Sequence, residues 1–367
     1  MTNTERALAI LNYEPYDRLP IVHFGYWAET LEKWVAEGHL PKGEDGRFDR
    51  AVEGTAAGPL LGFDFEWYPT YEPSADLDPP FERKIVKTFP DGSTHVQDSQ
   101  GVIVVQSPNA VSIPAEIDHL LKDRASWEEH FKPRLQWSER RMERNAYPEW
   151  NDSNAPQGLH CGSLIGTIRD RVGMVGLSYM MVDDEELLDE IIETVADLCL
   201  RNVKEALASG RRFDFAHFWE DICFKNGPLI NPTMFEEKIG PYYKRITEEL
   251  NKHGVDIVSV DCDGCIDMLV PIWLANGVNT MFPIEVGTWK ADIKPWRDKY
   301  GKALRGVGGM NKNLFALDRG AIDAEIERLK PLVALGGYIP CPDHRIPPTA
   351  KWDLVRYYCD RMRAGSF

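Results

Sequence analysis

The chain has 367 residues, of which 43% are hydrophobic and 27% are charged, and its formal net charge is −16. This composition is that of a globular protein with a large core. The negative charge argues against nucleic acid or an anionic membrane surface as a partner, because phosphate binding needs clustered Lys and Arg. No basic start precedes an apolar segment, no apolar run approaches the ~20 residues of a membrane span, and seven scattered cysteines suit a reducing compartment, so we expect a cytoplasmic protein.

The first part of the chain combines a strand–helix pair with an antiparallel segment. Residues 20–26 (PIVHFGY) predict a buried strand, and residues 28–38 have helical spacing. Within residues 81–105, an Asp-Gly turn at 91–92 joins two alternating segments, which predicts a β-hairpin. Because a hairpin interrupts an α/β pattern, we interpret about residues 70–155 as an insertion.

After residue 155, strands and helices alternate regularly. This order implies parallel pairing, and the number of units favours a closed (β/α)8 TIM barrel over an open sheet. We therefore expect an α/β protein with one domain over residues 1–367 and an N-terminal β-hairpin insertion. The strands are predicted at 213–221, 255–263, 279–286 and 303–309, and the helices at 182–210, 231–254, 266–277, 318–337 and in the segment that ends at Tyr300.

The stretch GGYIPCPDHRIPP, residues 336–348, sets one histidine among four prolines. Each proline fixes φ and removes a backbone donor. We expect a stiff loop that does not continue as a helix or a central strand and that holds His344 still.

Polar residues stand where strands end, which is where a barrel places its active site. His344 follows the last short strand and is the strongest single candidate. The other polar residues at strand ends are His23, Tyr26, Glu220, Asp221, Asp261, Asp263 and Glu285.

Several of these residues also have structural interpretations. His23 on an apolar strand can be a core histidine bonded to the backbone, and Asp261 and Asp263 can cap the helix that follows. Glu220 can be a cap or a member of an ion pair. Glu285 is harder to explain structurally, because an unpaired buried carboxylate is costly.

Several familiar site patterns are absent. The sequence has no GxxxxGK[ST], no GxGxxG after a strand, no GxSxG and no HExxH, which argues against phosphate transfer, nicotinamide chemistry and serine hydrolysis. Cys262 and Cys265 form a CxxC without a second pair, so buried thiols are favoured over a zinc site.

Four segments together carry a resemblance to a known family: RALAILNYEPYDRLPIV, GSLIGTIRDRVGMVGLSYMM, FWEDICFKNGPLINP and GGYIPCPDHRIPP. They resemble the uroporphyrinogen decarboxylase superfamily, a family of (β/α)8 barrels that also includes methyltransferases working with corrinoid proteins. The decarboxylases carry an arginine-rich segment after the first strand, whereas this chain has HFGYWAET and no arginine between Arg18 and Arg47. A pocket for a polycarboxylate without guanidinium groups, on a protein at −16, is implausible.

The thiol-methylating branch of that superfamily binds zinc through a His-x-Cys-Gly motif and a later cysteine. In our alignment, Asp261 stands at the histidine, Asp263 at the first cysteine and His344 at the last. The resemblance therefore implies an oxygen and nitrogen set in place of thiolates, which argues against a zinc-activated thiol acceptor.

The O-demethylating branch looks closest, through VHFGYWAETLEKWVAEGHL and DHRIPP. Its members pass a methyl group from an aryl methyl ether, such as vanillate, to the cob(I)amide of a separate corrinoid protein. The resemblance implies a small aromatic substrate, a corrinoid (cobalamin) carried by the partner protein, and a homodimer. Because cobalt is the nucleophile, the enzyme has to activate the leaving phenoxide by protonation or with a Lewis acid.

These expectations assign a role to each candidate. The catalytic candidates are His344, Glu220, Asp261, Asp263 and Glu285. A zinc ion would be held by Asp263, Glu285 and His344. The substrate-binding candidates are aromatic or polar residues near strand ends, which suit a planar ring but are also common in cores. They are His23, Tyr26, Trp27, Phe218 and Trp219.

Three alternatives stay open on the sequence alone. The methyl donor can be a methylamine-type or betaine compound used with the same corrinoid partner. The chain can be a uroporphyrinogen decarboxylase-like lyase acting on a smaller carboxylated substrate. It can also be a barrel that binds a ligand without catalysis.

Overall fold

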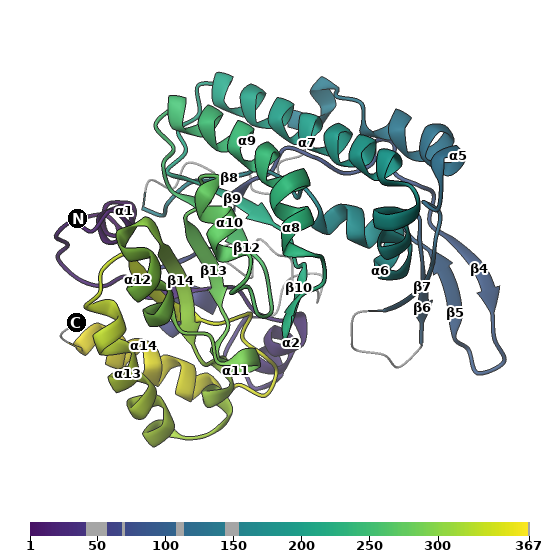
Figure 1. Ribbon diagram of the computed structural model, residues 1–367. Coiled ribbons are helices and arrows are strands. Elements are labelled where there is room, and N and C mark those ends of the chain that lie inside the picture. The colour runs from purple at the N-terminus through teal and green to yellow at the C-terminus, as the bar shows by residue number, and fades with distance from the viewer. Residues whose placement is uncertain (42–56, 68–69, 108–113, 144–153, 366–367) are drawn as a thin grey trace.

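The structure is a computed structural model that describes residues 1–41, 57–67, 70–107, 114–143 and 154–365. A (β/α)8 barrel forms its main body, which confirms the predicted fold (Figure 1). None of the helices in these ranges combines the length and the apolar character that a membrane crossing requires.

Eight strand positions build the barrel. Seven strands pair in parallel in the order β15-β14-β13-β12-β9-β8-β3, and β1 pairs in parallel with β2. β2 and β3 together fill the second position, since β2 pairs with β1 and β3 with β8. A bridge between Tyr26 and Ile346 links the segments after β1 and β15 and closes the ring. The strands are β1 (Val22–His23), β2 (Phe65–Glu66), β3 (Thr70–Tyr71), β8 (Gly158–His160), β9 (Phe215–Trp219), β12 (Val258–Asp261), β13 (Thr280–Ile284), β14 (Arg305–Met310) and β15 (Tyr338–Pro342).

Helices cover the outside of the barrel (Figure 1). The predicted helix at 182–210 is α7, and Gly210 follows its end with a φ of 78°, as expected for a C′ glycine. The helix predicted at 266–277 begins only at Val270, because Pro271 is tolerated only in the first turn. The helices are α1 (Asn3–Leu11), α2 (Ala28–Ala36), α4 (Gly58–Leu61), α6 (Gly166–Asp183), α7 (Glu185–Ala208), α8 (Pro232–Met234), α9 (Gly240–Lys252), α10 (Val270–Ala275), α11 (Val286–Trp289), α12 (Ile293–Tyr300), α13 (Arg319–Val333) and α14 (Trp352–Ala364).

An antiparallel sheet occupies the interval between β3 and β8. It has the order β4-β5-β6-β7 and projects beside α6, at the right of Figure 1. The predicted turn at 91–92 joins β4 to β5, so the predicted hairpin is confirmed and is extended by two strands. The bounds are β4 (Lys84–Thr88), β5 (Thr94–Gln97), β6 (Val102–Gln106) and β7 (Ala115–His119), followed by α5 (Arg124–Ser126) and helical turns to Met142. Residues 108–113 and 144–153 of the predicted insertion lie outside the described residues.

The prolines of the C-terminal segment do not keep it out of the barrel, contrary to our prediction. Pro340 and Pro342 belong to β15, which pairs with β14. The Asp343 N–H donates to the Met310 carbonyl, so the nitrogens of residues 339, 341 and 343 face β14. The nitrogens of the two prolines face the opposite edge, toward β1, where no ladder donor is needed.

Candidate active site

A pocket of about 170 Å³ opens where β1, β9, β12 and β15 end, and we call it the mouth pocket. Five of the residues that the sequence selected meet here: Trp27, Trp219, Asp261, Asp263 and His344. The complete lining is Phe24, Trp27, Trp219, Asp221, Asp261, Asp263, His344 and Arg345.

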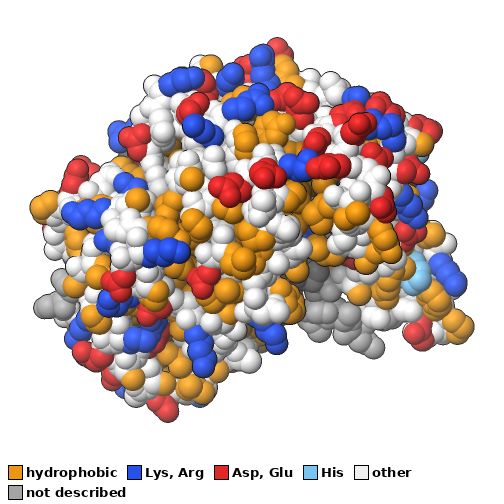
Figure 2. All heavy atoms as spheres, viewed as in Figure 1, with side chains coloured by type: hydrophobic (Ala, Val, Ile, Leu, Met, Phe, Trp, Pro, Cys, Tyr) orange, Lys and Arg blue, Asp and Glu red, His pale blue; other side chains and the backbone are white. Residues whose placement is uncertain are grey.

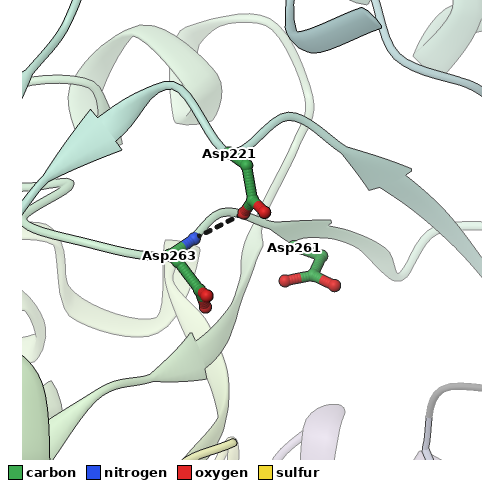
Figure 3. A group of neighbouring side chains, drawn as sticks. All are labelled: Asp221, Asp261 and Asp263. Carbon is green, nitrogen blue, oxygen red and sulfur yellow. Dashed lines mark hydrogen bonds between the residues drawn. The ribbon is translucent and has the colours of Figure 1, made fainter. Parts of the chain in front are cut away.

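Three aspartates form one wall of the mouth pocket (Figure 3). One carboxylate oxygen from each of Asp221, Asp261 and Asp263 lies within 4.8 Å of the others. The Asp263 N–H donates to the Asp221 carboxylate at 2.9 Å, which ties the segment after β12 to the segment after β9. Asp221 holds a φ of +47°, a conformation that costs a non-glycine residue about 1 kcal/mol.

Burial and the crowding of like charges raise the pKa values of two of the aspartates. Burial, and then the charge of Asp263, raise the pKa of Asp221 to about 7. Burial, together with the charges of Asp221 and Asp263, raises the pKa of Asp261 well above its usual value. Asp261 is only 4% exposed, and its carboxylate has no hydrogen bond to the described part of the chain. A cation between these carboxylates would relieve their mutual repulsion.

His344 faces the aspartates. Its Nε2 lies 3.3 Å from Oδ2 of Asp263. The imidazole stacks on Trp27, with ring centroids 5.9 Å apart, and has Phe24 on another side at 5.1 Å. The aromatic rings therefore orient the imidazole, and its Nε2 points to the carboxylate group.

Glu285 supports the site from outside the mouth pocket. One carboxylate oxygen accepts the Gly264 N–H at 2.6 Å, and the other accepts the Thr288 hydroxyl at 2.7 Å. Gly264 has a φ of +89°, and a Cβ there would collide with the Cys223 carbonyl, so only glycine suits this turn. Glu285 thus holds the turn directly after Asp263, and its oxygens are not among the atoms grouped around the aspartates.

Glu220 also lies outside the mouth pocket. It is completely buried, and its carboxylate accepts the N–H groups of Leu164, Ile165 and Gly166 at 2.8 to 3.1 Å. The hydroxyls of Ser163 and Tyr243 also donate to it. Burial raises its pKa, and these donors oppose that rise. Glu220 therefore caps the N-terminus of α6 and has no free face toward a substrate.

Three of the predicted substrate-binding residues are core residues. Phe218 is buried against Tyr243, and Tyr26 is buried against Trp34. His23 is buried, accepts the Gly25 N–H on Nδ1 at 3.0 Å, and has its pKa lowered by burial to about 3. The place of His23 on an apolar strand had suggested this core role as an alternative.

Strand alternation explains which residues reach the mouth pocket. Along β9, Trp219 and Asp221 face the pocket, whereas Phe218 and Glu220 face the helices. Asp221 was absent from our selected catalytic residues, although it has the same parity as Trp219. That parity was the signal in the sequence that could have identified it.

The residues that lie close enough together to bind a metal ion differ from the predicted metal ligands. Among the described residues, Asp221, Asp261 and Asp263 are the group whose atoms converge closely enough to hold an ion, and Glu285 is not in it. Three carboxylates suit a hard divalent cation such as Mg²⁺ or Mn²⁺, and a nitrogen from His344 would make the set acceptable to zinc. Cys262 is buried and Cys265 half-buried, and neither belongs to this group.

A family model and one solved structure agree with the barrel. The family model described as uroporphyrinogen decarboxylase (URO-D) matches residues 168–364. The fold is similar to that of a methyltransferase from Methanosarcina mazei, with a TM-score of 0.64, 14% identity, and coverage of 99% of this chain and 100% of that chain. A B12-independent methionine synthase from Shewanella sp. W3-18-1, in complex with selenomethionine, matches with a TM-score of 0.46, 13% identity, and coverage of 95% and 98%. No curated protein sequence matches.

The capping role of Glu220 predicts a loss of stability in Glu220→Gln. The amide nitrogen cannot accept hydrogen bonds, so part of the donor set around it would be left buried and unpaired. We expect the free energy of unfolding in urea to fall by about 3 kcal/mol. The exposed Glu186→Gln is the control and should change it by less than about 0.5 kcal/mol. Equal stabilities of the two variants would contradict the assigned role.

Burial of His23 predicts a specific dependence of stability on pH. Because its folded pKa is about 3 and an unfolded histidine has a pKa near 6.5, the unfolded chain binds one more proton between these values. This stability is therefore complete above pH 6.5 and is lost as the pH falls toward 3. The His23→Asn variant keeps an Oδ1 that can accept the Gly25 N–H. Its free energy of unfolding, measured in urea at several pH values between 7 and 4, should depend less steeply on pH than that of the unaltered chain, by the equivalent of about one proton. An unchanged slope would refute the prediction.

Proposed function

The chain belongs to the uroporphyrinogen decarboxylase (URO-D) family, and from that premise we propose that it transfers a methyl group from an aryl methyl ether to the cob(I)amide of a separate corrinoid protein. The observation that carries the proposal is the character of the mouth pocket. It has three carboxylates, one imidazole and three aromatic side chains, and Arg345 is its one basic residue among the described lining. Such a pocket disfavours a polycarboxylate and accommodates a flat aromatic ring.

The chemistry divides between the partner and this chain. The methyl–oxygen bond of the ether breaks, the methyl carbon bonds to the cobalt of the partner's corrinoid, and the phenolate oxygen receives a proton. His344 supplies that proton from Nε2, which lies 3.3 Å from the Asp263 carboxylate. Trp27 and Trp219 hold the ring beside His344.

The aspartates are the residues that would hold a metal ion. Asp221, Asp261 and Asp263 fit a divalent cation, because their carboxylates converge and the Asp261 carboxylate has no hydrogen bond within the described ranges. When bound, such an ion would supply Lewis acidity at the leaving oxygen.

A methylated ammonium compound is the second candidate donor. The observation in its favour is charge, because three carboxylates and the faces of Trp27 and Trp219 are groups that bind quaternary ammonium ions. The corrinoid acceptor would be the same. The two donor classes differ in their leaving group, since an amine leaves a quaternary ammonium without needing a proton from His344.

The first test is methyl transfer observed on the corrinoid. The chain is mixed with a corrinoid protein in the cob(I)amide state and with 3-methoxybenzoate, and the visible spectrum is followed for methyl-cobalt formation. We expect a donor-dependent change whose rate falls by roughly 100-fold or more in His344→Gln, because the general acid is lost. His253→Gln, at an exposed position, should match the unaltered chain. Methyl transfer from glycine betaine but from no methoxyarene would overturn the ether donor in favour of the second candidate.

The metal assignment predicts that binding of Mn²⁺ depends on Asp261. Asp261→Asn keeps the shape of the side chain and removes the charge, so Mn²⁺ affinity in isothermal titration should fall by roughly tenfold or more. Asp256→Asn, an exposed aspartate at the opposite end of the same strand, is the control. Equal affinities of the two variants would rule out the aspartate site.

A further inference from the structure

A second cavity, of about 490 Å³, lies beside the mouth pocket. Trp219 lines both, so the two cavities are neighbours at this side chain. Its walls come from the segment after β3, from the end of β8, from α6 and from Gln100 of the antiparallel sheet. We call it the seam cavity, because it lies where that sheet meets the barrel. Neither the proposed chemistry nor the aspartate group uses it.

One donor atom of a side chain that lines the seam cavity has no hydrogen-bond acceptor among the described residues. Arg171 is 2% exposed, and its Nε donates to Oε1 of Gln100 at 3.1 Å. Its Nη2 is buried and has no hydrogen-bond acceptor among the described residues. The carboxylate of Asp76 is 4.0 Å away, beyond hydrogen-bond distance. A buried guanidinium with an unused donor is costly, and a carboxylate is the group that matches its geometry.

Other groups of the cavity limit what can bind. His160 accepts the Gly162 N–H on Nδ1, so its Nε2 carries a hydrogen and can donate. Asp170 is paired with Arg169 at 2.5 Å. Glu72 and Asp76 also line the cavity and repel additional negative charge. One carboxylate bound to Arg171 is compatible with this set, whereas a dicarboxylate is not.

We propose that the seam cavity binds the carboxylate of the methyl donor through Arg171, so that the donor is a monocarboxylic acid whose methyl group lies in the mouth pocket. The identity of the donor rests on the proposed function, whereas the carboxylate site itself does not. The inference holds for both candidate donors, since a methoxybenzoate and a betaine each carry one carboxylate. Arg171 would be the residue that selects acids over their neutral analogues.

Glu220 connects the helix that carries Arg171 to the strand end that carries Asp221. Arg171 lies on α6, whose first N–H groups bind Glu220, the residue directly before Asp221. The same carboxylate therefore holds the helix that carries the seam-cavity arginine and the strand end that carries the first aspartate.

The test measures binding, without a corrinoid protein and without turnover. Isothermal titration of the unaltered chain compares 3-methoxybenzoate, its neutral analogue 3-methoxybenzamide, the dicarboxylate isophthalate, and acetate. We expect the methoxy acid to bind at least roughly tenfold more tightly than the amide, the dicarboxylate and acetate. Arg171→Gln should abolish the difference between acid and amide, and Gln100→Leu, which frees the guanidinium from its orienting contact, should reduce it. Arg140→Gln, at an exposed pair with Asp78, is the matched control and should keep it.

The outcomes separate this inference from the proposed function. Equal affinity for acid and amide in the unaltered chain would overturn the site, whether or not Arg171→Gln folds. Acetate binding as tightly as the methoxy acid would overturn the assignment of the carboxylate to the donor. If neither methoxy compound binds, glycine betaine against choline makes the same comparison, and equal affinities there overturn the site. Selective acid binding without methyl transfer would leave the site standing and count against the proposed reaction.

Discussion

The buried carboxylate of Glu220 is the interaction on which the arrangement of the site depends. Five donors from the start of α6 and from Tyr243 of α9 converge on it, so one side chain joins a strand end to two helices. Removing an acceptor of this kind leaves several donors buried and unpaired, which is far more costly than losing a surface contact. Since Asp221 is the next residue, the position of the first aspartate follows from this cap.

The candidate site gathers negative charge and backbone strain in one place. Three carboxylates converge after two neighbouring strands, and one of them, Asp221, has a left-handed backbone conformation. Burial and nearby like charge raise the pKa values of Asp221 and Asp261. The Asp263 N–H ties the segment after β12 to the segment after β9, and Glu285 holds the turn at Gly264. Strain and repulsion gathered at one point are typical of sites that bind a ligand or an ion.

The antiparallel sheet adds a second wall beside the barrel mouth. Its β7 packs on α6 at Gly173, where a φ of 75° bends the helix and a Cβ would collide with the His119 ring. The same sheet brings Gln100 to Arg171. Barrel enzymes commonly place reactive groups at strand ends and vary selectivity through added segments. In the function that we propose, the mouth pocket holds the reactive groups and the seam cavity provides selectivity.

Periodicity in the sequence was enough to predict the barrel, because the alternation of strands and helices and the Asp-Gly turn at 91–92 are local features. It also predicted that Asp261, Asp263 and His344 would meet, since parallel strands bring their carboxyl ends to one face. Only the tertiary structure decided which polar residues serve the site. Glu220 and Glu285 accept hydrogen bonds from the backbone of distant segments. Pro340 and Pro342 fit into β15 because their nitrogens face away from β14. Nη2 of Arg171 has no acceptor among the described residues. Those outcomes depend on partners far away in the chain, and no local pattern encodes them.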